Sequence, residues 1–190
     1  PLHALSMYKM PRKGLSKEPL KEIEALKEKG LPVTLVGDVM GTGSSRKSAT
    51  NSVLWHIGED IPYIPNKKTG GICIGEKVAP IFFNTMEDSG TLVFEADVEN
   101  LNMGDIISIF PARGEIKNEK GKLITKFSLK SETFLDEVRA GGRIPLIIGR
   151  SLTDKSREYL NLAPSEVFVR PGMDDDSDEG FTLAQKMVGQ

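Results

Sequence analysis

The pattern of apolar and polar positions opens with a helical repeat. Leu20, Ile23 and Leu26 follow one another at three-residue spacing, Ser16 stands before them as a candidate N-cap, and Gly30 comes after them. A capping serine, apolar residues on one face and a terminal glycine are typical of an amphipathic helix. We therefore expect a surface helix that stops at Gly30.

A strand, a glycine-rich loop and a helix are predicted next. Residues 31–36 form a short apolar run with β-branched members, which indicates a buried strand. Residues 37–43 contain three glycines and are interpreted as a loop. From residue 44 to residue 57, apolar side chains recur at four-residue spacing, which favours a helix. This strand–loop–helix unit is the most informative local pattern in the chain.

The rest of the chain alternates between strand-like and helix-like patterns. Strands are predicted over residues 71–75, 91–98, 105–110, 113–116 and 123–127, the last two joined as a β-hairpin. Helices are predicted over residues 80–88, 133–140 and 153–160, and a last apolar run at 145–148 is interpreted as buried. Trp55, Phe82 and Phe83 are expected in the core. Mixed strands and helices make α/β the expected fold class.

Length and composition predict one domain with an extension. The 190 residues exceed the roughly 150 of an average domain. After Pro171, acidic residues crowd into 174–179 without the glycine and spacing of a calcium loop, and helical propensity returns at 181–188. We expect a domain over residues 1–170, then 171–190 as an acidic linker and the start of a helix that leads to further domains. Because the chain begins at Pro1 rather than methionine, we expect a fragment or a processed form.

Charge and cysteine content argue against several classes of protein. The 25 basic and 27 acidic side chains give a net charge of -2, which argues against a dedicated nucleic-acid binder. Cys73 is the only cysteine, which excludes an internal disulfide framework and a self-contained four-cysteine metal site. His3 and His56 have no partner at metal-ligand spacing. No apolar run is long enough for a membrane span and no signal peptide is recognisable, so we expect a reduced, cytoplasmic setting.

The candidate chemistry lies in residues 41–48, which read GTGSSRKS. A P-loop or a dinucleotide-binding loop would need a glycine where Arg46 stands. A helix that starts near Ser45 would instead point free N–H groups and the positive end of its dipole at Ser44, which favours an anion or an oxyanion there. Arg46 adds a planar guanidinium that suits a carboxylate. A small polycarboxylate with a serine base fits this arrangement, and an ordinary serine N-cap on an ordinary helix is the alternative.

The string Gly43-Ser44-Ser45-Arg46 resembles the Gly-Ser-Ser-Arg signature of the swivel domain in the aconitase superfamily. Longer strings resemble the bacterial B-type branch of that superfamily and together span nearly the whole chain. They lie at residues 37–55, 79–88, 100–105, 137–150 and 180–189. The resemblance implies a three-layer swivelling β/β/α domain, with a mixed, partly parallel sheet and packed helices.

The same resemblance implies a part in a hydro-lyase reaction, the isomerisation of citrate to isocitrate through cis-aconitate in the tricarboxylic acid cycle. It makes Ser44 the base that takes the carbon-bound proton and makes Ser44, Ser45 and Arg46 the residues that bind substrate. It implies a 4Fe-4S cluster held by three cysteines on other domains of a longer chain, which are then partners, and it allows a homodimer. Cys73 is interpreted as a small buried apolar residue, and no metal ligand is assigned in this chain. We therefore expect the isolated chain to have no turnover.

Three alternatives stay open. The small subunit of isopropylmalate isomerase has about this size and the same serine signature, although the B-type strings and the C-terminal helix pattern argue against it. An RNA-binding module is suggested by family members that bind messenger RNA, although a net charge of -2 argues against it. Chemistry on 2-methylcitrate rather than citrate is the third, because the apolar side of the pocket would lie mostly on other domains.

Overall fold

A parallel sheet of three strands lies at the centre of the fold. The computed structural model describes residues 18–169, so the expectations for Ser16, His3 and residues 171–190 lie outside the described part of the chain. The sheet consists of β1 (Thr34–Met40), β4 (Ile72–Val78) and β5 (Leu92–Glu95), paired in parallel in the order β1-β4-β5. Because the three strands run in one direction, their carboxyl ends share one edge of the sheet.

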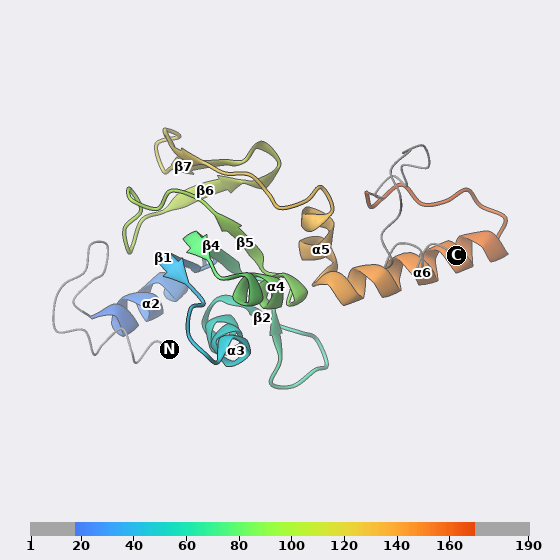
Figure 1. The fold of residues 1–190 in the computed structure, drawn as a ribbon, viewed down its shortest axis with the longest axis horizontal. Coiled ribbons are helices and arrows are strands. Elements are labelled where there is room, and N and C mark those ends of the chain that lie inside the picture. The colour runs from blue at the N-terminus through green and yellow to red at the C-terminus, as the bar shows by residue number, and fades with distance from the viewer. Residues whose placement is uncertain (1–17, 170–190) are drawn as a thin grey trace.

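Helices α3 (Arg46–Ile57) and α4 (Pro80–Asp88) lie on one face of this sheet (Figure 1). α3 follows β1, and α4 connects β4 directly to β5, so both helices begin at the carboxyl edge of the sheet. Proline suits the first position of α4, because the N–H that it lacks would have no partner inside the helix. The first described helix, α2 (Pro19–Glu28), precedes β1 and ends before Gly30, as predicted.

An antiparallel sheet forms a second layer. It consists of β6 (Ile107–Phe110), β7 (Glu115–Asn118) and β8 (Leu123–Lys126), in the order β6-β7-β8, with the short helix η1 (Pro111–Arg113) between β6 and β7. The predicted hairpin is therefore confirmed as β7 and β8, although its first strand spans Glu115–Asn118 rather than residues 113–116, because Arg113 still belongs to η1. Its turn is held by Asn118, whose side-chain oxygen accepts hydrogen bonds from the N–H groups of Lys120 and Lys122.

The two sheets and the helices stack as three layers. In Figure 1 the antiparallel sheet lies on one side of the parallel sheet, and α3 and α4 lie on the other. Ala96 forms an isolated bridge with Phe127, and the Phe127 ring stacks on Phe94 of β5 at 3.8 Å between centroids. The expected three-layer α/β architecture is confirmed. Its core is made of buried apolar side chains from both sheets and α4, among them Cys73, Ile74, Phe82, Met86, Val93, Phe94 and Ile116.

Shorter elements and a protruding helix complete the fold. β2 (Glu59–Asp60) and β3 (Lys68–Thr69) pair as a small antiparallel ribbon between α3 and β4. α5 (Phe134–Ala140) is followed by α6 (Arg143–Tyr159), which extends away from the sheets in Figure 1. The described helices include none long and apolar enough to cross a bilayer.

The boundaries of the strand–loop–helix unit differ from those predicted. β1 continues to Met40, so residues 37–40, which were expected in the loop, belong to the strand. The register pairs Gly37 with Gly75 and Met40 with Val78, because the partner strand β4 extends that far. α3 begins at Arg46, with Ser45 as its N-cap, rather than at residue 44. The true loop is therefore only residues 41–45.

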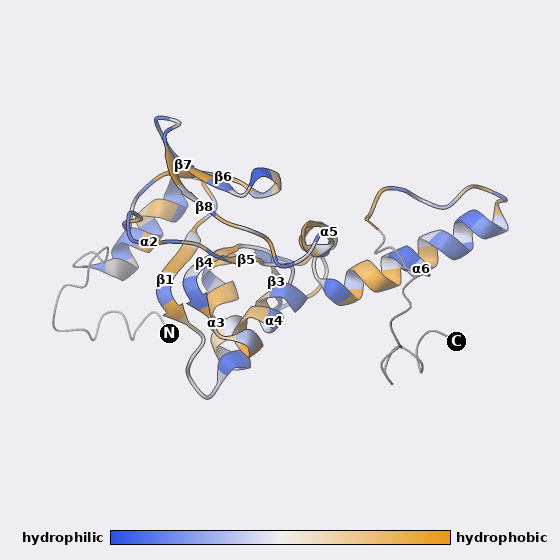
Figure 2. Cartoon of the chain, turned by 45° about the horizontal axis from the view of Figure 1, so that its top comes forward, coloured by the Kyte–Doolittle hydropathy of each residue, from blue (hydrophilic) through white to orange (hydrophobic). Residues whose placement is uncertain are grey.

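Two predictions about burial are wrong. Residues 145–148 were expected as a buried run, but they form the first turns of α6, in which Leu146 is 3% exposed while Ile147 and Ile148 are 54% and 53% exposed. Figure 2 shows apolar residues along this half of the helix. Trp55 was expected in the core, but it is 55% exposed on α3, with the ammonium of Lys68 lying 5.5 Å from its ring.

Candidate functional site

The turn from β1 to α3 carries the serine signature and lies at the carboxyl edge of the parallel sheet. The carbonyl oxygen of Met40, the last residue of β1, accepts a hydrogen bond from the N–H of Ala79 at 2.9 Å. Ala79 is the N-cap of α4, so the end of β1 is tied to the start of that helix. Gly41 then turns the chain with a φ of +74°, a conformation that side chains with a Cβ rarely adopt. The turn is thus fixed where it leaves the sheet.

The other end of the turn is fixed by α3. The carbonyl oxygen of Ser45 accepts the N–H of Ala49 at 2.9 Å, and the hydroxyl of Thr50 donates to the carbonyl oxygen of Arg46 at 3.2 Å. Thr50 is fully buried, and Leu54 is buried one turn further along α3. α3 is therefore anchored in the fold, and at its start Ser44 and Ser45 are exposed while Arg46 is partly buried.

The two serine hydroxyls do not serve the helix as ordinary caps. Ser45 occupies the N-cap position, yet its side chain makes no capping hydrogen bond. Both Ser44 and Ser45 are exposed. Ser45 therefore does not act as an ordinary serine cap. The free N–H groups of the first turn stay available to an anion.

Positive charge dominates this helix end. The first turn of α3 contains no acidic residue, and it contains Arg46 and Lys47. Within residues 18–169, no carboxylate lies within ion-pair distance of Arg46. Two exposed serines, a partly buried arginine and the positive end of the helix dipole thus lie together at this helix end, which suits a small ligand with several carboxylates.

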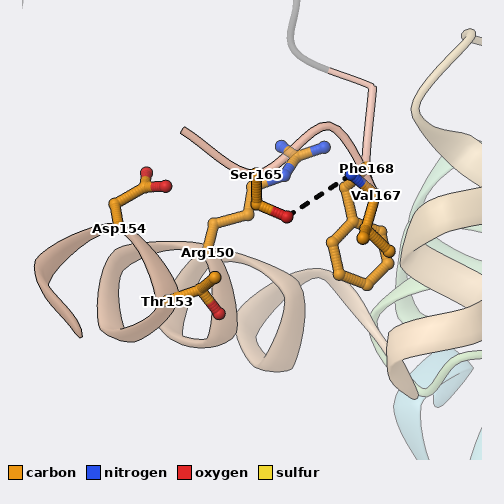
Figure 3. Close-up of a pocket in the computed structure, with 6 residues that line it drawn as sticks. All are labelled: Arg150, Thr153, Asp154, Ser165, Val167 and Phe168. Carbon is orange, nitrogen blue, oxygen red and sulfur yellow. Dashed lines mark hydrogen bonds between the residues drawn. The ribbon is translucent and has the colours of Figure 1, made fainter. Parts of the chain in front are cut away.

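Two cavities are present elsewhere in the described part of the chain, and neither is lined by the signature. One of about 330 Å³ lies beyond the carboxyl ends of β4 and β5, and its lining includes Val78, Phe83 and Lys130. The other, of about 160 Å³, lies between α6 and the segment after it, around Arg150 and Phe168 (Figure 3). Ser44 and Ser45 are exposed and Arg46 is partly buried, so a substrate there would need a second surface to enclose it.

Residues 18–169 offer no set of ligands for an iron–sulfur cluster. Cys73 is the second residue of β4 and has no exposed surface, and burial raises the pKa of its thiol to about 12. A buried neutral thiol behaves as a small apolar residue, which confirms the interpretation of Cys73. The described residues contain no group of three or more His, Cys, Asp or Glu side chains that could hold a metal ion. His56, near the C-terminal end of α3, belongs to no such group.

One residue that shapes the site was not expected from the sequence. Phe82, on the first turns of α4, packs against Gly41 so closely that a Cβ at Gly41 would lie 2.2 Å from the Cβ of Phe82. The sequence marks Gly41 only as one glycine among several, and Phe82 is far from it along the chain. Only the β1–β4 pairing brings the two residues together.

Comparison with known proteins finds relatives over the whole chain. The family model described as aconitate hydratase 2 N-terminus matches residues 1–181. Proteins named aconitate hydratase B match 100% of this chain, with 59% identity over 197 residues in Escherichia coli strain K12 and 64% over 192 residues in Synechocystis. The chain spans only 23% and 21% of the lengths of these two relatives.

A solved structure supports the fold. The crystal structure of a 3-isopropylmalate dehydratase from Methanocaldococcus jannaschii aligns with a TM-score of 0.51 and 23% identity, over 65% of this chain and 68% of that one. At this identity the likeness extends to the fold alone. The match of the family model to nearly every residue is what identifies the sequence, and the chain belongs to the aconitate hydratase 2 N-terminus family.

Proposed function

We propose that this chain is the swivel domain of an aconitate hydratase, with residues 1–170 as the domain and residues 171–190 as its link to the rest of a longer polypeptide. The domain presents Ser44, Ser45 and Arg46 to a substrate enclosed between it and the other domains, where citrate and isocitrate interconvert through cis-aconitate. The observation that carries the proposal is the exposed, positively charged helix end that bears the serine signature in a chain of this family.

In this proposal Ser44 Oγ accepts the proton from the substrate carbon. A serine hydroxyl is a weak base, and it needs an environment that stabilises its deprotonated form. Ser44 lies immediately before the N-terminus of α3, where the helix dipole and unpaired N–H groups favour negative charge. Arg46 adds a full positive charge two residues away. These groups lower the energy of an alkoxide at Ser44, and hence the barrier to proton removal.

Ser45 and Arg46 hold the carboxylates of the substrate. The guanidinium of Arg46 can donate two parallel hydrogen bonds to one carboxylate, and Ser45 can donate a third because its hydroxyl is not used for capping. Fixing the substrate in this way orients the carbon-bound proton toward Ser44. Proximity of this kind accelerates a proton transfer that would be rare between free molecules.

The remainder of the proposal concerns what lies outside these 190 residues. The 4Fe-4S cluster that the family resemblance implies would be bound by other parts of the longer polypeptide, because Cys73 is the only cysteine here and is buried. The chain alone is therefore expected to show no turnover. We place the enzyme in the cytoplasm, as part of the tricarboxylic acid cycle.

The test is the Ser44→Ala variant of the full-length, cluster-loaded polypeptide. Hydration of cis-aconitate should fall by at least about 10²-fold, because the group that returns the proton to the substrate carbon is lost. The absorption spectrum of the cluster should stay unchanged. Ser48→Ala is the matched control, since Ser48 is an exposed serine on the first turn of the same helix and has no assigned role. Normal turnover in Ser44→Ala would refute the base assignment.

A further inference from the structure

The side chain nearest to the serine turn at Gly41 comes from another helix. Phe82 belongs to α4, is 2% exposed, and lies directly against the side of Gly41 on which a Cβ would stand. A Cβ built there would lie 2.2 Å from Phe82 Cβ, 2.5 Å from Cγ and 3.1 Å from Cδ1. Real Cβ atoms do not approach other carbons below about 3 Å, so the backbone of the turn touches the phenylalanine as closely as packing allows.

We infer that Phe82 is a positioning residue for Ser44, an inference that rests on the proposed function of that serine. The phenyl ring fixes how near the turn lies to α4, and the hydrogen bond from Ala79 N–H to the Met40 carbonyl fixes the preceding residue. Gly41, with its φ of +74°, is the residue that lets the backbone fit into this corner. Together they define the point from which the chain runs to Ser44.

The neighbouring residues are held differently. Ser45 and Arg46 belong to the start of α3, where their carbonyl oxygens accept hydrogen bonds from Ala49 and Thr50. The stretch between the two fixed points is residues 42–44, and at Gly43 a built Cβ would meet no atom within 4 Å. A loss of the wall behind Gly41 should therefore displace Ser44 more than it displaces the substrate-binding Arg46.

This difference predicts a distinctive kinetic effect. In the full-length enzyme, Phe82→Ala removes Cγ and the ring and should lower kcat by about tenfold to a hundredfold, because displacement of a catalytic group by about 1 Å costs rate on this scale. The KM should change by less than about threefold, since α3 still holds Arg46. Phe82→Leu keeps Cβ, Cγ and a Cδ against Gly41, and it should retain most of the activity.

The glycine supplies a second variant from the other side of the contact. Gly41→Ala must push the turn away from Phe82, since its new Cβ cannot stay at 2.2 Å, and it should lower kcat at least as much as Phe82→Ala does. In the double variant the two losses should not multiply, because the clash with Cβ of residue 82 has already pushed the turn away, so that removing the ring adds little. Multiplying losses would mean that the two residues act independently, which would overturn the inference.

Met86→Ala is the matched control. Met86 lies one turn further along the same helix and has no exposed surface, so its loss removes a similar amount of core packing, while the three atoms nearest to a Cβ at Gly41 all belong to Phe82. We expect Met86→Ala to lower the denaturation midpoint while kcat per folded molecule stays near that of the parent. An equal fall of kcat in Met86→Ala and Phe82→Ala would show that Phe82 acts only through general stability, and would overturn the inference.

Hydrogen exchange separates this inference from the proposed function. In the 190-residue chain, the amide of Ala79, whose hydrogen bond to the Met40 carbonyl ties down the start of the turn, should exchange faster in Phe82→Ala than in the parent or in Met86→Ala, whatever the turn does chemically. Unchanged exchange there would overturn the positioning role. Faster exchange, together with full turnover in Ser44→Ala, would leave Phe82 as the wall of the turn and refute only the role of Ser44.

Discussion

Arg143 of α6 donates a hydrogen bond from Nη2 to the carboxylate of Glu87 on α4, and so ties the protruding helix to the body of the fold. The Nε of the same guanidinium lies 3.6 Å from Asp88 and 3.5 Å from Glu137, while the ammonium of Lys130 lies 3.7 Å from Glu87. The side chains of Glu87 and Glu137 are only 4% and 11% exposed. Arg143 thus compensates the negative charge of two carboxylates, Glu87 and Glu137, that are poorly solvated.

The first prediction follows from removing that arginine. Arg143→Ala leaves two poorly solvated carboxylates without their main partner, and it should lower the free energy of unfolding by about 2–3 kcal/mol. Urea denaturation followed by circular dichroism measures the change. Arg139→Ala is the control, because Arg139 is an exposed arginine on α5. Among the described residues its one ion pair is with Asp136, at 3.4 Å. Equal losses in the two variants would contradict the special position of Arg143.

The second prediction concerns pH. Burial raises the pKa of the Glu87 carboxyl above its usual 4.5, against the opposing effect of Arg143 and Lys130. The folded state then binds its proton more tightly than the unfolded state does. Glu87 therefore contributes most to stability below about pH 4.5, and this contribution declines as the pH rises through the raised pKa.

Glu87→Gln removes the titrating group and provides the test. The difference in unfolding free energy, parent minus variant, should become smaller between about pH 4 and about pH 7. Urea titrations of both proteins across this range measure it. A difference that grows with pH would mean that the attraction of Arg143 outweighs the effect of burial.

The third prediction uses two glycines of the same helix. Gly142, the N-cap of α6, has a φ of +130°, and a Cβ there would lie 2.2 Å from the backbone oxygen of Asp88. Gly142→Ala should cost at least about 2 kcal/mol of stability. Gly149 lies inside α6, where a Cβ would meet nothing within 4 Å, so Gly149→Ala should stabilise the protein by about 0.5–1 kcal/mol. If the denaturation midpoints of Gly142→Ala and Gly149→Ala shifted in the same direction, the proposed difference between the two glycines would be contradicted.

The fourth prediction concerns substrate binding in the full-length enzyme. Arg46→Lys keeps the positive charge but loses the planar fork of donors, so the KM for citrate should rise about tenfold or more while kcat falls less. Lys47→Ala removes the neighbouring exposed charge and should change the KM only slightly. Steady-state kinetics decide between them, and an unchanged KM in Arg46→Lys would remove that residue from the binding site.

Local patterns were enough to predict much of the fold. The run of small and apolar residues around Cys73 predicted β4, and the turn that Asn118 supports predicted the β7–β8 hairpin. These elements were predictable because each is specified by its own few residues. The apolar run at residues 145–148 was not, since periodicity in four residues cannot separate a buried strand from an amphipathic helix. In the structure only Leu146 of that run packs inward.

The candidate site was predictable in part for the same reason. Ser44, Ser45 and Arg46 are neighbours in sequence, and a helix N-terminus beside them follows from local propensity. The end of β1 at Met40 was missed, because the pairing with β4 determines where the strand stops. The role of Phe82 had no local signal at all. It arises from a contact between residues that only the assembled sheet brings together.

That contact sets an order of events during folding. The serine signature is complete as a string once residue 46 has been synthesised, but Phe82, which backs its turn, comes later in the chain. β1 also has to wait for β4, its neighbour in the parallel sheet, which ends at Val78. A nascent chain in which α4 has not yet been synthesised therefore contains the signature residues but not the final conformation of their turn. The turn acquires its final shape in the same step in which the centre of the domain condenses, so no early intermediate should present a finished binding surface.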